Sequence, residues 1–66
     1  MSKDYMQTSI GSYKVRLEGR KEDAIVAIRD GAWWTAQIAL SECIRYEAAI
    51  EELEHQIEVA EVMGDD

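Results

Sequence analysis

The chain has 66 residues, a formal net charge of −7, and a composition that is 47% hydrophobic and 32% charged. This composition is typical of a folded chain, and the length fits one domain over residues 1–66. The negative charge disfavours direct binding to nucleic acid or to an anionic membrane and favours a protein target with a basic surface. Because no segment matches a signal peptide or a membrane span, we expect a cytoplasmic protein.

A chain this short needs reinforcement, since it buries only about 60% of its unfolded surface when it folds alone. The single Cys excludes an internal disulfide, and the single His argues against a zinc site of the usual kind. Association with a second copy is the reinforcement that remains. The sequence therefore predicts a homodimer.

The first half of the chain allows two interpretations. Residues 1–8 are polar, and we expect them to be frayed. Residues 9–29 form a helix in the preferred interpretation, because an apolar stripe recurs at helical spacing: Ile10, Tyr13, Leu17, Ala24 and Ile28. Gly11 and Gly19 weaken a helix by roughly 1 kcal/mol each relative to Ala. The alternative is a β-strand over residues 13–18, where apolar and charged residues alternate, followed by two helices.

Asp30-Gly31 predicts a tight turn, because Gly readily takes the left-handed conformation that ends a helix. Helices joined by so short a connection pack antiparallel. Residues whose numbers sum to about 61 should then lie side by side, as Lys14 and Glu47 would. This register brings opposite charges together.

Residues 33–63 predict one long helix, since they contain neither Gly nor Pro. Written as heptads, the helix has an apolar or aromatic residue at each a and d position from Ala36 to Ala60. Because the first helix is expected to begin only at about residue 9, the seam beyond about Leu53 would lack a partner in its own chain. We therefore expect a dimer interface at Cys43, Tyr46, Ile50, Leu53, Ile57 and Ala60.

The predicted architecture is all-α, an antiparallel helical hairpin that pairs with its copy in a four-helix bundle. This plan resembles the plasmid copy-number regulator Rop, also a short hairpin with a tight turn near its middle. The resemblance covers architecture alone. The basic face with which such a protein would hold RNA is missing, so no function or residue is carried over.

Trp33 and Trp34 follow the turn directly, in a segment that is apolar nearly all round. Such a segment must be covered on several sides. Both rings plug the end of the bundle beside Ile25 and Ile28 in one interpretation. In the other, Trp34 stands exposed as an anchor for a partner, because aromatic residues are enriched among binding hot spots.

The second half of the long helix carries a stripe of carboxylates at alternating spacings of four and three residues: Glu47, Glu51, Glu54, Glu58 and Glu61. Residues 64–66 add an acidic tail. The stripe is a solvated face in one interpretation, partly paired with the cations of residues 14–21. In the other it is a row of charge that imitates backbone phosphates and enters a groove meant for nucleic acid.

The sequence offers little for catalysis, and we expect no enzyme, no cofactor and no metal. Glu52 and His55 have the Glu-x-x-His spacing of di-iron bundles, but their heptad positions lie away from the seam. No Ser-His-Asp set or phosphate-binding Gly loop is present.

The preferred functional hypothesis is a small, non-catalytic, acidic inhibitor or modulator that binds a protein through the Trp pair and the Glu stripe. In size, charge and lack of chemistry it is similar to phage-encoded proteins that block host defence or transcription, some of them as DNA mimics, in the host cytoplasm. The alternative is a structural or assembly coiled-coil protein with no inhibitory role.

Overall fold

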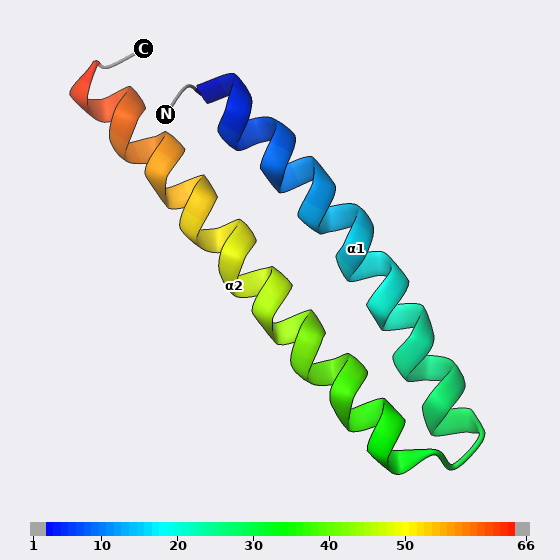
Figure 1. Cartoon of the computed structure of the whole chain (residues 1–66). Helices are drawn as coiled ribbons and strands as arrows, with labels where there is room; N and C mark the ends of the chain where they lie inside the picture. The colour runs from blue at the N-terminus through cyan, green and yellow to red at the C-terminus, as the bar shows by residue number, and fades with distance from the viewer. Residues whose placement is uncertain (1–2, 65–66) are drawn as a thin grey trace.

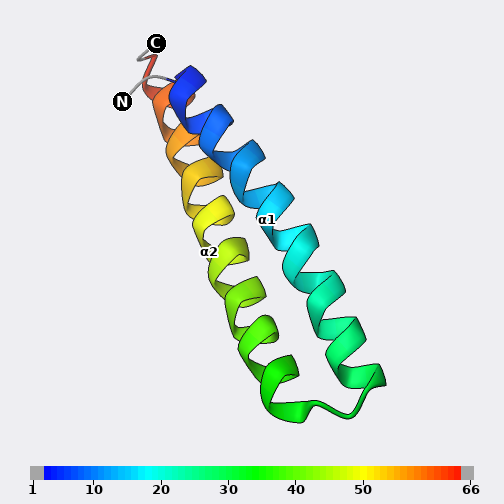
Figure 2. The same cartoon turned by 45° about the vertical axis from the view of Figure 1, so that its right-hand side comes forward.

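The computed structural model describes residues 3–64, which form two helices, α1 (Lys3–Arg29) and α2 (Trp33–Met63). The helices run antiparallel as a hairpin of 50 × 14 × 13 Å, with both chain ends at the end opposite the turn (Figures 1 and 2). The prediction of an all-helical hairpin is confirmed, and the bounds of α2 are those expected.

α1 differs from the expectation in two ways. Residues 13–18 are helical, so the strand alternative is wrong. Residues 3–8 belong to α1 as well, so the expected start of this helix at residue 9 is wrong, and residues 1 and 2 lie outside the described part of the chain. Met6 accounts for the longer helix, because its buried side chain extends the apolar stripe by one turn beyond Ile10. Gly11 and Gly19 lie on the exposed side of α1.

The connection is a Schellman motif, in which backbone groups beyond the helix end satisfy its last carbonyls. The amide of Ala32 donates to the carbonyl of Ala27 at 2.8 Å, and the amide of Gly31 donates to that of Ile28 at 3.1 Å. Gly31 adopts the left-handed conformation at φ 73°. The Asp30-Gly31 turn thus reverses the chain where the sequence predicted.

α2 ends at a second left-handed glycine, Gly64, whose amide donates to the carbonyls of Ala60 and Glu61. Of the predicted acidic tail, residues 65 and 66 lie outside the described residues. The observed register agrees with the predicted one. The rings of Tyr13 and Tyr46 lie 5.9 Å apart, and Arg20 Nε lies 3.7 Å from Glu42 Oε1.

The core changes character along the hairpin. We call residues 18–44 the turn half, and residues 3–17 and 45–63 the terminal half. In the turn half the buried residues are small: Ala24, Ala27, Ala36 and Ala39, with Cys43 at the boundary. In the terminal half Met6, Ile10, Leu17 and Ile50 are buried instead. Tyr13, Tyr46, Leu53 and Ile57 pack partly buried around the cluster of Ile10, Leu17, Cys43 and Ile50.

The structure corrects the premise behind the expected dimer interface. α2 beyond Leu53 was predicted to lack a partner in its own chain, and this is wrong, because α1 begins at Lys3. Leu53 and Ile57 pack partly buried against the hairpin core, and Ala60 is also partly buried. Cys43 and Ile50 are buried between the helices, with Tyr46 beside Tyr13. The seam of α2 therefore serves the hairpin itself.

Candidate binding surfaces

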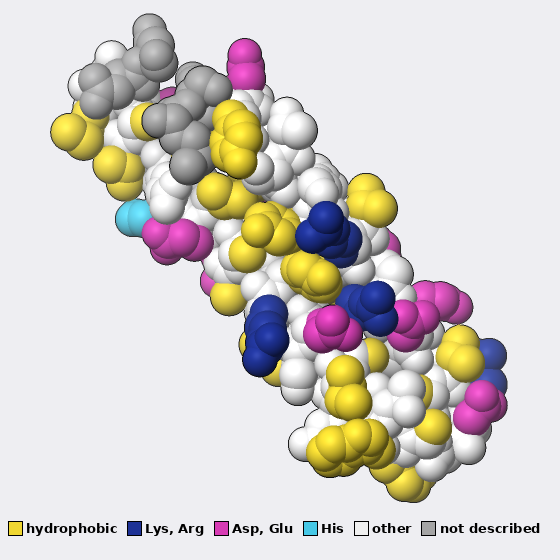
Figure 3. Space-filling model, in the orientation of Figure 1, with side chains coloured by type: hydrophobic (Ala, Val, Ile, Leu, Met, Phe, Trp, Pro, Cys, Tyr) yellow, Lys and Arg dark blue, Asp and Glu magenta, His cyan; other side chains and the backbone are white. Residues whose placement is uncertain are grey.

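The turn half exposes a large apolar surface, and its two tryptophans are among the most exposed apolar residues there. Trp33 is 67% exposed and Trp34 is 74% exposed, so the single chain buries neither ring. Six aliphatic side chains of the turn half are also exposed: Ile25, Val26, Ile28, Ile38, Leu40 and Ile44. Hydrophobic side chains gather over the turn end of the face drawn in Figure 3. The segment after the turn was expected to be covered on several sides, and within the single chain it is not covered.

The two flanks of the hairpin differ in their cations. The lysine flank contains Lys14 and Lys21, and there Glu47 borders both an acidic groove and an apolar hollow. The arginine flank contains Arg16 and Arg20, and its hollows are bordered by Asp23 and Glu42. Because Glu47 lines both features of the lysine flank, it marks the point where that flank changes from apolar, toward the turn, to acidic, toward the termini.

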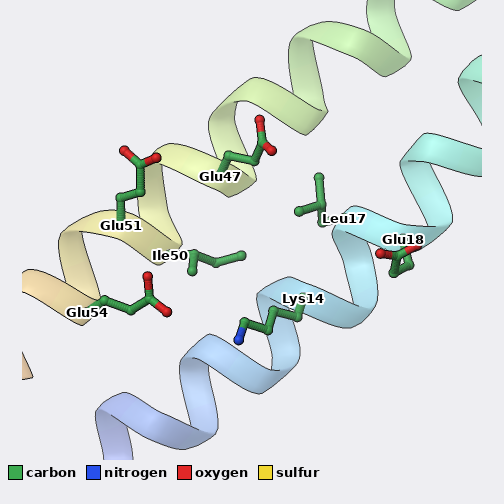
Figure 4. A pocket seen from close by; sticks show the side chains of 7 residues that line it. All are labelled: Lys14, Leu17, Glu18, Glu47, Ile50, Glu51 and Glu54. Atoms are coloured by element: carbon green, nitrogen blue, oxygen red, sulfur yellow. The ribbon is translucent and has the colours of Figure 1, made fainter.

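The acidic groove of the lysine flank has a volume of about 400 Å³. Glu47, Glu51 and Glu54 line it from α2, and Lys14 and Glu18 line it from α1, with Leu17 and Ile50 between them. Figure 4 shows the Glu54 carboxylate and the Lys14 ammonium pointing toward each other, whereas the carboxylates of Glu47 and Glu51 point away from α1. The groove offers carboxylates above an apolar floor.

Two of the nearby cations, Arg20 and Lys21, form ion pairs with carboxylates outside the stripe. Arg20 pairs with Asp23 at 3.0 Å and with Glu42 at 3.7 Å, and Lys21 pairs with Glu18 at 3.4 Å. Within residues 3–64, Glu47, Glu51, Glu54 and Glu58 form no ion pair. Pairing of the stripe with Lys14, Arg16, Arg20 and Lys21 was one expectation. Arg20 and Lys21 have other partners, and no ion pair joins Lys14 or Arg16 to these four carboxylates in the described chain. The stripe continues to Glu61, which is also exposed.

The residues considered for metal binding, Glu52 and His55, lie on the surface of α2. Glu52 accepts a hydrogen bond from Gln56 Nε2 at 3.2 Å, and His55 is exposed. Over the described residues, no group of three or more His, Cys, Asp or Glu side chains could hold a metal ion. The Cys43 thiol is free and buried. Neither described helix combines the length and the hydropathy that crossing a membrane requires.

The sequence contained a signal for the apolar surface that the predicted sites did not use. Leu40 and Ile44 lie outside the a and d positions of the heptads. The expected dimer interface consisted only of seam residues: Cys43, Tyr46, Ile50, Leu53, Ile57 and Ala60. The signal is the size of the seam residues. Where Ala occupies the seam, the large apolar residues of the same helix stand on the outside.

Comparison of the chain with protein-family models, with curated proteins and with solved structures gives no match. The likeness to Rop therefore rests on the plan of the chain alone.

Proposed function

We propose that the protein is a non-catalytic acidic modulator that binds a basic surface of another protein. The observation that carries this proposal is the stripe of four exposed carboxylates, Glu47, Glu51, Glu54 and Glu58, which have no ion-pair partner among the described residues. A basic partner would supply the missing countercharge, and a stripe held on one rigid helix loses little conformational entropy on binding.

The geometry of the stripe suits a groove that accepts nucleic acid. Side chains three and four residues apart on a helix lie about 5 to 6 Å from one another. Four such carboxylates extend over about 17 Å of α2, since each residue advances the helix by about 1.5 Å. A regular row of negative charge is also what a phosphate backbone presents. In this form of the proposal the protein is a DNA mimic of the phage anti-defence type, which acts in the host cytoplasm.

The test is charge reversal of the stripe, with Glu51→Lys, Glu54→Lys and Glu58→Lys combined. The control reverses three exposed carboxylates scattered off the stripe, with Asp4→Lys, Glu22→Lys and Glu52→Lys, so that both variants change net charge equally. Immobilised wild type and both variants are exposed to one lysate, and the retained proteins are quantified by mass spectrometry.

We expect the stripe variant to lose its basic partners by more than tenfold, while the scattered variant keeps them. The same partners should elute as salt rises from about 0.05 to 0.5 M, because exposed charges are screened over a shorter distance. Competing duplex DNA should displace them if the stripe acts as a mimic. Retention of the same proteins by the stripe variant would show that the acidic stripe is not the binding surface.

A second candidate function, self-assembly, is favoured by a separate observation, the exposed apolar surface of the turn half. Monomeric soluble proteins rarely expose large contiguous apolar patches. In this form the protein is an assembly module whose hairpins pair as a homodimer, with four helices at the contact. Because such a contact is apolar, its strength should change little with salt, which separates it from binding through the stripe.

A further inference from the structure

The lysine flank of the turn half contains an apolar hollow of about 330 Å³, lined mainly by Ile25, Ile28, Leu40 and Cys43. Trp33 lies seven residues before Leu40 and so shares its line along α2, and Ile44 lies one turn beyond Leu40. We call Ile25, Ile28, Trp33, Leu40 and Ile44 the turn patch. All five side chains are exposed in the single chain.

We propose that a second copy of this chain docks on the turn patch, with the two hairpins antiparallel and overlapping through their turn halves alone. The proposal deepens the second candidate function, self-assembly, and does not depend on the partner of the acidic stripe. It also replaces the seam residues Leu53 and Ile57, which the hairpin core already occupies, as the place where copies meet.

The size of the patch fits a dimer. A Trp side chain and four aliphatic side chains, each about half exposed or more, offer roughly 500 Å² of apolar surface per chain. Two such patches in contact bury about 1,000 Å², which reaches the lower limit for a specific interface. Interfaces near this lower limit belong to weak or transient complexes, so the dimer is measured at micromolar and higher concentrations.

Charge selects the orientation. In a parallel dimer the stripes of both copies would lie side by side and repel, because Glu47, Glu51, Glu54 and Glu58 have no ion-pair partner within the described chain. In a fully overlapped antiparallel dimer, each stripe would face the turn patch of the other copy and bury carboxylates against Trp33 and Leu40. An antiparallel overlap limited to the turn halves brings patch onto patch and carries the two stripes to opposite ends.

The arginine flank is a poorer match for a second copy. Its hollow in the turn half is bordered by Arg20, which forms ion pairs with Asp23 and Glu42 at the same hollow. Docking there would desolvate these charges without new partners. The hollow of the lysine flank is lined by fewer charged side chains, Lys21 and Glu47, against four on the arginine flank. It is also lined by three large aliphatic side chains, against Val26 and Ile38 on the arginine flank.

The experiment compares two substitutions on opposite flanks of the same helix. Leu40 is 47% exposed on the lysine flank, and Ile38 is 48% exposed on the arginine flank. Wild type, Leu40→Lys and Ile38→Lys are measured by sedimentation equilibrium from about 1 to 200 µM, and far-ultraviolet circular dichroism verifies that each remains helical. Small-angle X-ray scattering of the wild-type dimer gives its maximum dimension.

We expect Leu40→Lys to weaken the dimer by tenfold or more and Ile38→Lys to leave it unchanged within about twofold. A dimer that overlaps only through the turn halves should be about 80 Å long, because two 50 Å hairpins then share about 17 Å of helix. A dimer about 50 Å long, or one broken by Ile38→Lys and not by Leu40→Lys, would overturn the proposal. A chain that is still monomeric at 200 µM would also overturn it. If the Trp fluorescence of that monomer shifts to the blue on phosphatidylcholine vesicles, the patch binds lipid instead of a second copy.

These outcomes are independent of those for the acidic stripe. Reversal of Glu51, Glu54 and Glu58 leaves the turn patch intact and should preserve the dimer. Leu40→Lys leaves the stripe intact and should preserve binding of a basic partner by the monomer. Failure of one proposal therefore does not imply failure of the other.

Discussion

The turn half and the terminal half of the hairpin distribute their apolar residues in opposite ways. In the turn half, alanines are buried between the helices, and Ile, Leu and Trp side chains stand on the outside. In the terminal half, Met6, Ile10, Leu17 and Ile50 are buried, and the outside of α2 carries carboxylates up to its last turns, where Val59, Val62 and Met63 are exposed. The helix pair thus buries large apolar side chains in the terminal half, whereas in the turn half it buries small ones and exposes large ones.

The difference separates stability from association. Burying a large aliphatic side chain stabilises a fold by about 1.5 to 3 kcal/mol, and Ala contributes much less because its side chain is one methyl group. The terminal half therefore supplies most of the hydrophobic free energy that holds the hairpin closed. The turn half keeps most of its apolar surface available to a second molecule.

The largest effect on this contrast should come from Ile50→Ala, which removes a side chain that is 7% exposed in the core of the terminal half. Such a truncation costs about 2 to 5 kcal/mol. This is a large part of the roughly 3 to 10 kcal/mol expected in total for a chain of this length. Urea unfolding followed by circular dichroism at 222 nm should show a free energy of unfolding lower by about 2 to 5 kcal/mol.

Ile44→Ala is the matched control for Ile50→Ala, with the same side chain removed from the exposed surface of the same helix. Measured below the concentration at which copies pair, it should change the free energy of unfolding by less than about 0.5 kcal/mol. Equal losses for the two variants would contradict the division of the hairpin into a stabilising half and an associating half.

A middle-sized effect is expected from Ala39→Leu, which enlarges the alanine seam of the turn half. Ala39 is buried where the helices meet, so a larger side chain must push them apart. Overpacking of this kind costs about 1 to 3 kcal/mol. Ala48→Leu, on the exposed face of α2, should be nearly neutral in the same urea titration. If Ala39→Leu stabilised the hairpin, the seam would have to be loosely packed rather than filled by alanine.

The smallest effects concern two glycines and have opposite signs. Gly31→Ala should destabilise the hairpin by about 1 kcal/mol, because φ of 73° is strained for a residue with a Cβ. Gly19→Ala should stabilise it by about 1 kcal/mol, because Ala is the better helix former and the added Cβ meets no atom within 4 Å. Thermal melting resolves both shifts. If both substitutions shifted the melting temperature in the same direction, the backbone conformation at one of the two glycines would differ from that described.

The elements with strong local signals were predictable from the sequence. α2 lacks Gly and Pro from Trp33 to Met63, and Gly31 and Gly64 close the two helices, so its bounds matched the expectation. The start of α1 was missed because the polar residues around Met6 hid one apolar position. That single turn decides whether Leu53 and Ile57 are covered by their own chain.

The candidate surfaces were predictable in part. The spacing of the Glu stripe follows from helical periodicity, but the ion pairs of Arg20 and Lys21 depend on side-chain conformations that the sequence does not specify. The heptad assignment counted Ala36 and Ala39 as equal to Ile50 and Leu53. Because hydrophobic free energy scales with buried area, residue size and not only residue class decides which end of a helical pair is left uncovered.

The placement of both chain ends beside each other, far from the turn, sets how this protein presents itself to its surroundings. The first turn of α1 and the last turn of α2 lie at one end of the 50 Å hairpin, and the tryptophans that begin α2 lie at the other end, the tip (Figures 1 and 2). A fluorophore or an affinity handle can therefore be attached at either end without obstructing the tip, whereas a bulky handle risks shielding the negative charge near the base.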